Sequence, residues 1–321
     1  MEAVRLHPGG VLRFEQVADP RPPNGDVLVE LRAAALNRRD LLVRRGLYPF
    51  ALPLVLGSDG AGVRADTGEE VVILPSLNWG GDEAASGPDF QILGGPRDGT
   101  YAGLVAVPAA NVYPKPQHLS WEEAAALPLA GLTAYRALFV RGALRRGETV
   151  LVLGAGSGVS TFAVQLAVQA GARVLVTSSS PEKIERARAL GASEGVLYTD
   201  AEWGAHVREL SGGGADVVLD SVGATWQDSL DVARPGGRVV VFGATGGDRV
   251  ELDVRRLYFG HRSLLGTTMG SPSDFEALLE LVAERAWTPV VDSVWALSAA
   301  ECAHGRLSGG EHFGKVVLST V

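Results

Sequence analysis

The sequence predicts an α/β fold with two domains, one rich in β-strands and one built on an open parallel sheet. Residues 149–180 follow the order strand, glycine-rich turn, helix, strand, which is typical of a right-handed βαβ unit. Residues 1–117 instead contain short apolar runs separated by Gly/Pro turns, which favours a barrel-like β domain. A chain of 321 residues is also long for a single core.

The first domain is predicted from its short strands and from the C-terminal tail. We expect one helix at 39–45, a linker at 114–116, and strands at 26–33, 60–63, 70–74 and 101–107. The tail contains an amphipathic helix at 275–285 and strands at 290–295 and 315–318. We therefore assign residues 1–117 and 269–321 to this domain and residues 118–268 to the second.

The second domain is predicted from alternating strands and helices. A helical stretch begins at Ser120 and leads into the βαβ unit. We then expect a turn at 235–237, helices at 159–169, 181–190, 201–210 and 225–233, and six strands at 150–153, 173–177, 195–198, 216–220, 238–242 and 263–267. Six strands form a full dinucleotide-binding sheet.

The glycine-rich turn of the βαβ unit points to a cofactor. A turn of this kind lets backbone N–H groups approach a pyrophosphate at the positive end of the helix dipole. The pattern departs from G-x-G-x-x-G, because alanine and serine replace its first and last glycines. A plain turn without a bound cofactor is therefore the alternative interpretation. With its flanking strands the turn predicts dinucleotide binding. The hexad is Ala155, Gly156, Ser157, Gly158, Val159 and Ser160.

Composition excludes several function classes. The net charge of −8 argues against a nucleic-acid surface as the main partner. We find neither an apolar run near 18 residues nor a signal peptide, so we expect a cytoplasmic protein without a membrane partner. The one cysteine, Cys302, excludes an intrachain disulfide and any metal site with several cysteines. The six histidines are scattered, and we interpret them as surface or packing residues.

The chain resembles the medium-chain dehydrogenase/reductase superfamily, and within it the zinc-independent quinone oxidoreductases. The resemblance implies a GroES-like catalytic domain split in sequence around a Rossmann domain. The segments that carry it are AAALNRRDLLVRRGLYP (33–49), GSDGAGV (57–63), DGTYAGLVAVP (98–108), WEEAAALPLAGLTAYRAL (121–138), GAGSGV (154–159), DVVLDSVG (216–223), GGRVVVFGA (236–244) and HFGKVVL (312–318).

The positions of the zinc ligands are where the chain departs from its zinc-type relatives. The resemblance places Asn37, Ser58 and Leu129 where those relatives carry Cys, His and Cys. Residues 78–95 match the loop that carries their structural zinc but contain no cysteine. We therefore predict no zinc at either place. GAGSGVS and the 79–95 loop still look like zinc-type members, so an alcohol dehydrogenase with a metal held elsewhere stays an alternative.

The resemblance also implies the substrate class and the catalytic residues. Without a metal, no Lewis acid stabilises an alkoxide, whereas a quinone or an α,β-unsaturated carbonyl delocalises the new charge itself. Tyr48 corresponds to a tyrosine that faces the substrate, with a core or turn aromatic as the alternative. Asn37 and Asp40 resemble an Asn-x-x-Asp near the nicotinamide ribose, Asp40 being alternatively a cap. Thr133 resembles a threonine beside the nicotinamide.

Cofactor choice depends on the end of the second strand of the βαβ unit. NAD enzymes usually have a carboxylate there, whereas this chain has Ser178 and Ser179, with Lys183 one turn further on. We therefore expect NADPH, although Ser180 also suits a helix N-cap. The resemblance adds Tyr198 near the adenosine phosphate and Lys315 as a phosphate contact, with a plain surface lysine as the alternative for Lys315. It places Phe242, Gly243, Thr267 and Met269 beside the nicotinamide.

We therefore predict an oxidoreductase that reduces a quinone or enone with NADPH and without zinc. A non-catalytic NADPH-binding sensor is the alternative from another functional class, because the zinc ligands are missing. The strand at 263–267 is expected at a sheet edge, and edges are usually covered. Relatives of this kind join such edges, so we expect a homodimer.

Overall fold

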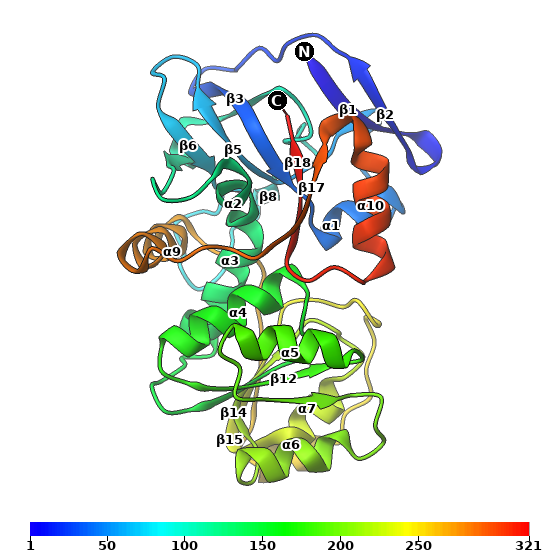
Figure 1. Cartoon of the computed structure of the whole chain (residues 1–321), viewed down its shortest axis with the longest axis vertical. Coiled ribbons are helices and arrows are strands. Elements are labelled where there is room, and N and C mark those ends of the chain that lie inside the picture. Colours follow the sequence, from blue (N-terminus) through cyan, green and yellow to red (C-terminus); the bar gives the residue numbers. More distant parts are fainter. Residues whose placement is uncertain (321) are drawn as a thin grey trace. The chain divides into compact units, whose positions relative to one another are not determined.

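The computed structural model describes residues 1–320, which form two compact units (Figure 1). Unit 1 contains residues 1–132 together with the segment that begins at Gly270, and unit 2 contains residues 133–269. The first boundary falls later than the predicted 117/118. The reason is that α2 (Trp121–Ala126) buries three alanines and packs on β3, β5 and β18 of unit 1.

Unit 1 is built on a sheet in the order β10-β6-β5-β3-β18-β17, with β9 also paired to β3. The strand β18, from the C-terminal segment, is antiparallel to β3 and parallel to β17, and Figure 1 shows it in red beside the blue β3. The bounds are β3 Asp26–Ala35, β5 Asp59–Arg64, β6 Glu70–Ile73, β9 Leu104–Pro108, β10 Val112–Pro114, β17 Val291–Ala296 and β18 Lys315–Ser319.

Smaller elements complete unit 1. A second sheet has the order β2-β1-β4, and β7 pairs with β8. Their bounds are β1 Glu2–His7, β2 Val11–Gln16, β4 Leu54–Val55, β7 Ser76–Leu77 and β8 Gln91–Ile92. The remaining elements are α1 Arg38–Arg44, α9 Pro272–Arg285, α10 Ala300–Gly309 and the 3-10 turns η1 Pro8–Gly10, η2 Ala109–Asn111 and η4 Leu297–Ala299.

The helix α10 is absent from the sequence prediction. Its sequence, AECAHGRLSG, contains two glycines and a histidine, which weaken the helical pattern. The structure nevertheless buries Ala300, Ala303, His304 and Leu307, whose spacing forms one face of a helix. The short helix α8 (Val254–Phe259) of unit 2 also lies outside the prediction.

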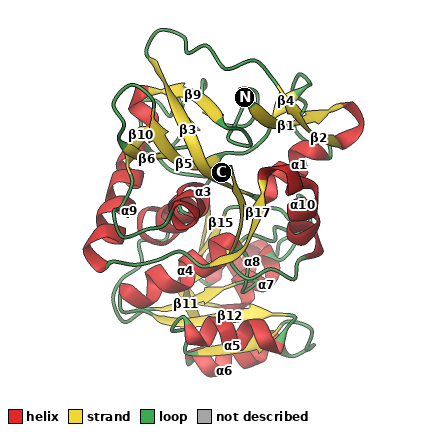
Figure 2. Cartoon of the chain, turned by 45° about the horizontal axis from the view of Figure 1, so that its top comes forward, coloured by secondary structure: helices red, strands yellow, loops and turns green. Residues whose placement is uncertain are grey.

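Unit 2 confirms the predicted Rossmann sheet. Its six strands are all parallel in the order β13-β12-β11-β14-β15-β16, which is the doubly wound order. Figure 2 shows α5 beside β12, whereas α6 packs against β13 and β14. The bounds are β11 Thr149–Val152, β12 Arg173–Ser178, β13 Glu194–Leu197, β14 Ala215–Asp220, β15 Ala233–Val241, β16 Ser263–Gly266, α4 Gly158–Gln169, α5 Pro181–Ala189, α6 Trp203–Ser211 and α7 Trp226–Val232.

Two local predictions differ from the structure. The helical stretch from Ser120 is three segments, α2, α3 (Pro128–Tyr135) and a π-helical turn at Arg136–Arg141, because Pro128 cannot continue α2. The turn at 235–237 lies within the extended segment β15, where the pairing with β14 shifts register. Over residues 1–320, no helix has both the length and the apolarity needed to span a membrane.

Candidate active site and cofactor site

The centre of unit 1 is a buried ion pair bridged by an amide. Lys315 Nζ lies 2.8 Å from Asp59 Oδ2 and donates a hydrogen bond to Asn37 Oδ1 at 2.6 Å. Asn37 Nδ2 donates to the same Asp59 oxygen at 2.9 Å. The side chains of Lys315, Asp59 and Asn37 are 2%, 0% and 6% exposed, respectively. We call these three residues the Lys315 triad.

Sheet order brings the Lys315 triad together. Lys315 begins β18, Asp59 begins β5, and β3 lies between these two strands. Asn37 follows the end of β3 as the N-cap of α1. The second oxygen of Asp59, Oδ1, accepts a hydrogen bond from the backbone N–H of Leu129 at 2.8 Å. Both carboxylate oxygens are therefore satisfied, as a buried charge requires.

The triad and its neighbours do not fit a catalytic zinc ion. The three positions where the resemblance places zinc ligands are Asn37, Ser58 and Leu129. Asn37 is bonded within the triad, Ser58 Oγ donates to Leu93 O at 2.7 Å, and Leu129 has no donor atom in its side chain. The ammonium of Lys315 already supplies a cation there. Residues 1–320 contain no group of three or more His, Cys, Asp or Glu that could hold a metal ion.

Aromatic packing and a half-buried arginine order the loop at 78–95. Trp79 is 4% exposed, meets the ring of Phe90 edge-on at 5.4 Å, and donates from Nε1 to Asp82 O. At the far end of the loop, the Arg39 guanidinium donates to Gly94 O and Gly95 O. The loop thus has internal contacts at the place where the resemblance implies a structural metal in zinc-type members.

Asp40 has the capping role that the sequence left as an alternative. It is fully buried, and its Oδ2 accepts hydrogen bonds from the Asn37 N–H at 2.8 Å and the Tyr101 hydroxyl at 3.0 Å. With Asn37 it forms a capping box at the start of α1. Burial raises the pKa of Asp40, and raises the pKa of Tyr101 well above its ordinary value. This geometry favours positioning of Asn37 over contact with a cofactor.

Tyr48 is a half-exposed phenol whose ring is held in place. The side chain is 44% exposed and stacks with Phe50 at 6.4 Å and an angle of 9°. The Arg39 guanidinium lies 5.8 Å from the Tyr48 ring and 5.6 Å from the Phe50 ring. Arg39 therefore joins this loop to Gly94 and Gly95. This arginine was not identified from the sequence, although it lies within the NRRD segment.

In unit 2 the glycine-rich turn fits a pyrophosphate. Gly154 and Gly156 have φ of 73° and 108°, the left-handed region that glycine adopts without strain. Ser157 then caps α4 by accepting from Ser160 N at 3.1 Å. The turn follows β11, which has β12 on one side in the sheet and β14 on the other. The turn therefore lies where the strand order reverses. Phosphates bind at such a helix N-terminus.

The other cofactor residues predicted in unit 2 gather at the same edge of the sheet. They follow the carboxyl ends of strands, Ser178 and Ser179 at β12, Tyr198 at β13, Phe242 and Gly243 at β15, and Thr267 and Met269 at β16. The Thr267 Oγ1 is buried and has no hydrogen-bond partner among residues 1–320. A Cβ on Gly243 would lie 2.7 Å from Ser221 O. The Gly243 contact reflects only the nearby Ser221 backbone, whereas the shared sheet edge and the unpartnered Thr267 hydroxyl fit a bound dinucleotide.

The end of β12 combines one buried serine, Ser178, with a capped helix. Ser178 is 3% exposed, and its Oγ accepts a hydrogen bond from Ser180 N at 3.1 Å. Ser180 in turn caps α5 by accepting from Lys183 N, which is the alternative role expected from sequence. Tyr198 is 48% exposed. No acidic side chain follows β12 directly, since residues 178–180 are serines.

Two more predicted site residues are buried, and one buried carboxylate was not identified from the sequence. Lys315 uses two N–H donors inside unit 1, a location that does not favour the predicted phosphate contact. Thr133 is buried in α3 and is assigned to unit 2. Asp220, missed from sequence, ends β14 and accepts bonds from Val222 N, Gly223 N, Thr225 Oγ1 and Ser229 Oγ. A carboxylate directly after an apolar strand was the available signal.

Comparison with family models agrees with both units. Residues 23–117 match the alcohol dehydrogenase GroES-like domain, and residues 158–284 match the zinc-binding dehydrogenase domain. A zinc-type alcohol dehydrogenase-like protein of Schizosaccharomyces pombe is 35% identical, over 96% of this chain and 94% of that protein. A quinone oxidoreductase of Pseudomonas aeruginosa is 34% identical, over 96% and 95% of the two chains.

Solved structures repeat this pattern. The crystal structure of an NAD-dependent alcohol dehydrogenase has a TM-score of 0.94 and 42% identity to this chain, and the match covers 100% of both chains. The quinone oxidoreductase of Thermus thermophilus, also described in complex with NADPH, has a TM-score of 0.84 and 32% identity. That match covers 99% of this chain and 100% of the other.

The Lys315 triad generates a prediction about stability. Replacement Lys315→Met leaves the Asp59 carboxylate buried without its cation, so we expect the free energy of unfolding to fall by about 3–5 kcal/mol. Adding Asp59→Asn removes the unpaired charge and should restore part of that loss. Urea unfolding of the wild type, both single variants and the double variant measures the coupling. Arg255→Met, at an exposed position of α8, is the control. Strictly additive losses would contradict the pairing.

Proposed function

Because the chain belongs to the medium-chain dehydrogenase/reductase superfamily and is an oxidoreductase of that family, we propose that it transfers a hydride from NADPH to a quinone or an α,β-unsaturated carbonyl without zinc. One observation carries the proposal. Asn37 and Ser58 stand where the resemblance places two of the zinc ligands. The Asn37 side chain is hydrogen-bonded to Lys315 and Asp59, and the Ser58 hydroxyl is hydrogen-bonded to Leu93 O.

The lack of zinc ligands favours one class of substrate over another. Oxidising a simple alcohol builds up alkoxide charge on its oxygen, and an alcohol is about as weak an acid as water, so a Lewis acid that stabilises this charge favours the reaction strongly. Hydride addition to a quinone or enone places the new charge on an oxygen that is conjugated with carbon. One or two hydrogen bonds and correct orientation then suffice.

The roles of the chain's residues follow from their positions. Bound NADPH supplies the hydride. The Gly154–Gly156 turn and the N-terminus of α4 hold its pyrophosphate, and the edge with Phe242, Gly243 and Thr267 borders its nicotinamide. The Tyr48 hydroxyl donates a hydrogen bond to the substrate oxygen. Asn37 and Thr133 orient the reacting groups, while Asp40 and Lys315 hold Asn37 in place.

Preference for NADPH is supported by the end of β12. Three serines and Lys183 stand where an NAD enzyme usually has a carboxylate that accepts from the ribose hydroxyls. The T. thermophilus relative is described with NADPH, whereas the NAD-dependent alcohol dehydrogenase, with higher identity, represents the opposite choice. The lack of a carboxylate after β12 decides for NADPH in this proposal.

We expect steady NADPH oxidation with a simple quinone and no oxidation of ethanol-like alcohols. Tyr48→Phe should lower turnover about tenfold, the effect of one lost hydrogen bond near 1.4 kcal/mol, and leave NADPH affinity unchanged. Tyr258→Phe, at a tyrosine that is 54% exposed in unit 2, is the matched control. Turnover that is equal in Tyr48→Phe and wild type would remove Tyr48 from the site.

Two further outcomes would replace the proposal. Tight NADPH binding without turnover on a broad panel of quinones and enones would favour the sensor function. One zinc per chain after a chelator wash, together with alcohol oxidation, would favour the zinc-type alcohol dehydrogenase that the S. pombe relative's name describes.

Cofactor preference is tested by a charge at the end of β12. Ser178→Asp places a carboxylate near the 2′-phosphate, and the repulsion is about 1–4 kcal/mol at 4 Å, depending on the effective dielectric constant. We expect the ratio of NADPH to NADH affinity, measured by calorimetry, to fall at least tenfold. Ser178→Asn is the uncharged control and should change it much less. Tighter binding of NADH by the wild type would show that the assignment is wrong.

We also propose a cytoplasmic homodimer. The strand β16 is the last strand of the unit 2 sheet and, within residues 1–320, pairs only with β15, so its outer edge has backbone groups that a second copy can bind. Light scattering at micromolar concentration should give twice the chain mass of 33.6 kDa. A monomer under these conditions would exclude the dimer.

A further inference from the structure

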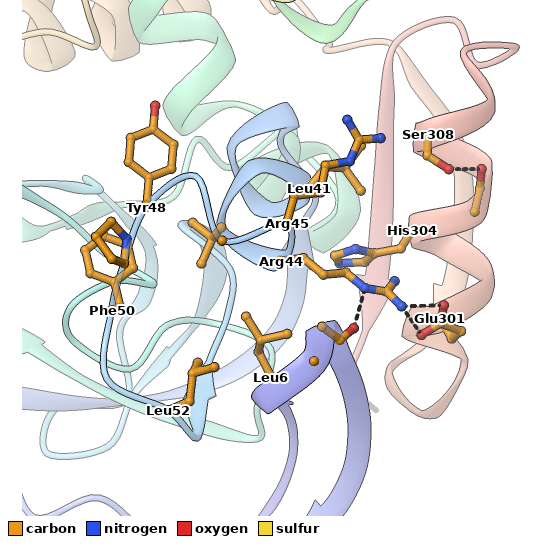
Figure 3. A pocket seen from close by; sticks show the side chains of 16 residues that line it. Leu6, Leu41, Arg44, Arg45, Tyr48, Phe50, Leu52, Glu301, His304 and Ser308 are labelled. Carbon is orange, nitrogen blue, oxygen red and sulfur yellow. Dashed lines mark hydrogen bonds and ion pairs between the residues drawn. The ribbon is translucent and has the colours of Figure 1, made fainter.

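Unit 1 contains a cavity that shares only Tyr48 with the residues assigned to the proposed hydride transfer. Its volume is about 690 Å³, within the range of small-molecule sites. Figure 3 shows α10 on one side and the loop with Tyr48 and Phe50 on the other. The walls come from β1, η1, α1, the loop after α1, and α10. Its apolar lining includes Leu6, Leu41, Val43, Phe50 and Leu52.

A buried histidine without a partner lies in the wall of this cavity. His304 of α10 is 1% exposed, and neither ring nitrogen has a hydrogen-bond partner among residues 1–320. The edge-on ring of Tyr101, with centroids 5.8 Å apart, covers one side. In Figure 3 the imidazole is directed toward Arg44 and the cavity. Buried polar groups are normally bonded, so an unmet donor and acceptor here suit a ligand.

The charges around His304 favour an anion. Arg44 Nε donates to Gly10 O at 2.8 Å, and Nη2 donates to both oxygens of Glu301 at 2.8 and 3.0 Å. This arginine is thereby held at the cavity wall. The Arg45 side chain also lines the cavity, is exposed, and has no hydrogen-bond partner among residues 1–320. Two arginines against one glutamate leave a net positive charge in the lining.

Burial and the nearby Arg44 lower the pKa of His304 to about 4. The imidazole is therefore neutral at pH 7, with one N–H donor and one acceptor nitrogen. A neutral donor close to the Arg44 guanidinium suits a carboxylate, which accepts several hydrogen bonds at once. The apolar wall from Leu6 to Phe50 suits a hydrocarbon body.

We infer that this cavity binds an amphipathic monocarboxylate, with its hydrocarbon body against Leu6, Leu41 and Phe50 and its carboxylate at His304 and the two arginines. The site lies wholly within unit 1 and needs neither NADPH nor a quinone. Tyr48 also borders the cavity, so the ligand lies against the loop that carries the proposed substrate donor.

Calorimetry on the full chain without cofactor tests the inference with three probes of equal chain length: octanoate, 1-octanol and octylammonium. We expect saturable binding of one octanoate per chain, at least tenfold weaker binding of 1-octanol, and no binding of octylammonium. Equal binding of octanoate and 1-octanol would overturn the anion site. Absence of saturable octanoate binding below micelle formation would overturn the site altogether.

Variants locate the binding. His304→Phe keeps an aromatic ring against Tyr101 but removes both ring nitrogens, and should weaken octanoate binding about tenfold. Arg45→Gln changes a side chain with no hydrogen-bond partner in the described structure, so it should fold normally and weaken binding severalfold. Arg255→Gln, an exposed arginine of unit 2, is the matched control. Unchanged affinity in both His304→Phe and Arg45→Gln would contradict the assignment, whatever the enzyme assays show.

Discussion

Asp59 and Lys315 are buried side chains of opposite charge, and much of unit 1 is arranged so that they form an ion pair. Each charge alone would make burial very costly, so the strands that carry them must lie on either side of β3. The Asn37 amide between them fixes the start of α1, and the second Asp59 oxygen holds the start of α3 through Leu129 N. One electrostatic requirement therefore orders two helices and three strands.

This pair also changes what the site can do. A metal ion offers an open coordination position that a substrate oxygen can enter and leave. The Lys315 ammonium is instead surrounded by protein and bonded to Asn37 and Asp59. It contributes a fixed positive charge without exchangeable ligands. The proposed substrates suit such a site, because their own conjugation disperses the charge that a metal would otherwise neutralise.

The sequence predicted those parts whose signals are local. The six strands of unit 2 were predictable because apolar runs alternate with segments of helical periodicity. Gly156 could be recognised as part of a dinucleotide-binding turn from the strand and helix that flank it. The Lys315 triad was not predictable, since Lys315 lies 256 positions from Asp59 and 278 from Asn37. No local pattern reports such a contact. The helix α10 was missed because its inward face includes His304. Residues 118–132 were assigned to the second domain because helical periodicity does not reveal which sheet a helix covers.

The place of β18 in the sheet has a consequence for biosynthesis. Domains usually fold as units in the order in which they leave the ribosome. Here the strand between β3 and β17 is encoded after the whole of unit 2, so the N-terminal segment emerges first yet lacks a central strand and the cation that pairs with Asp59. Unit 2, continuous from 133 to 269, can be completed earlier. The nascent N-terminal segment must therefore stay soluble with an open sheet while the rest of the polypeptide is translated.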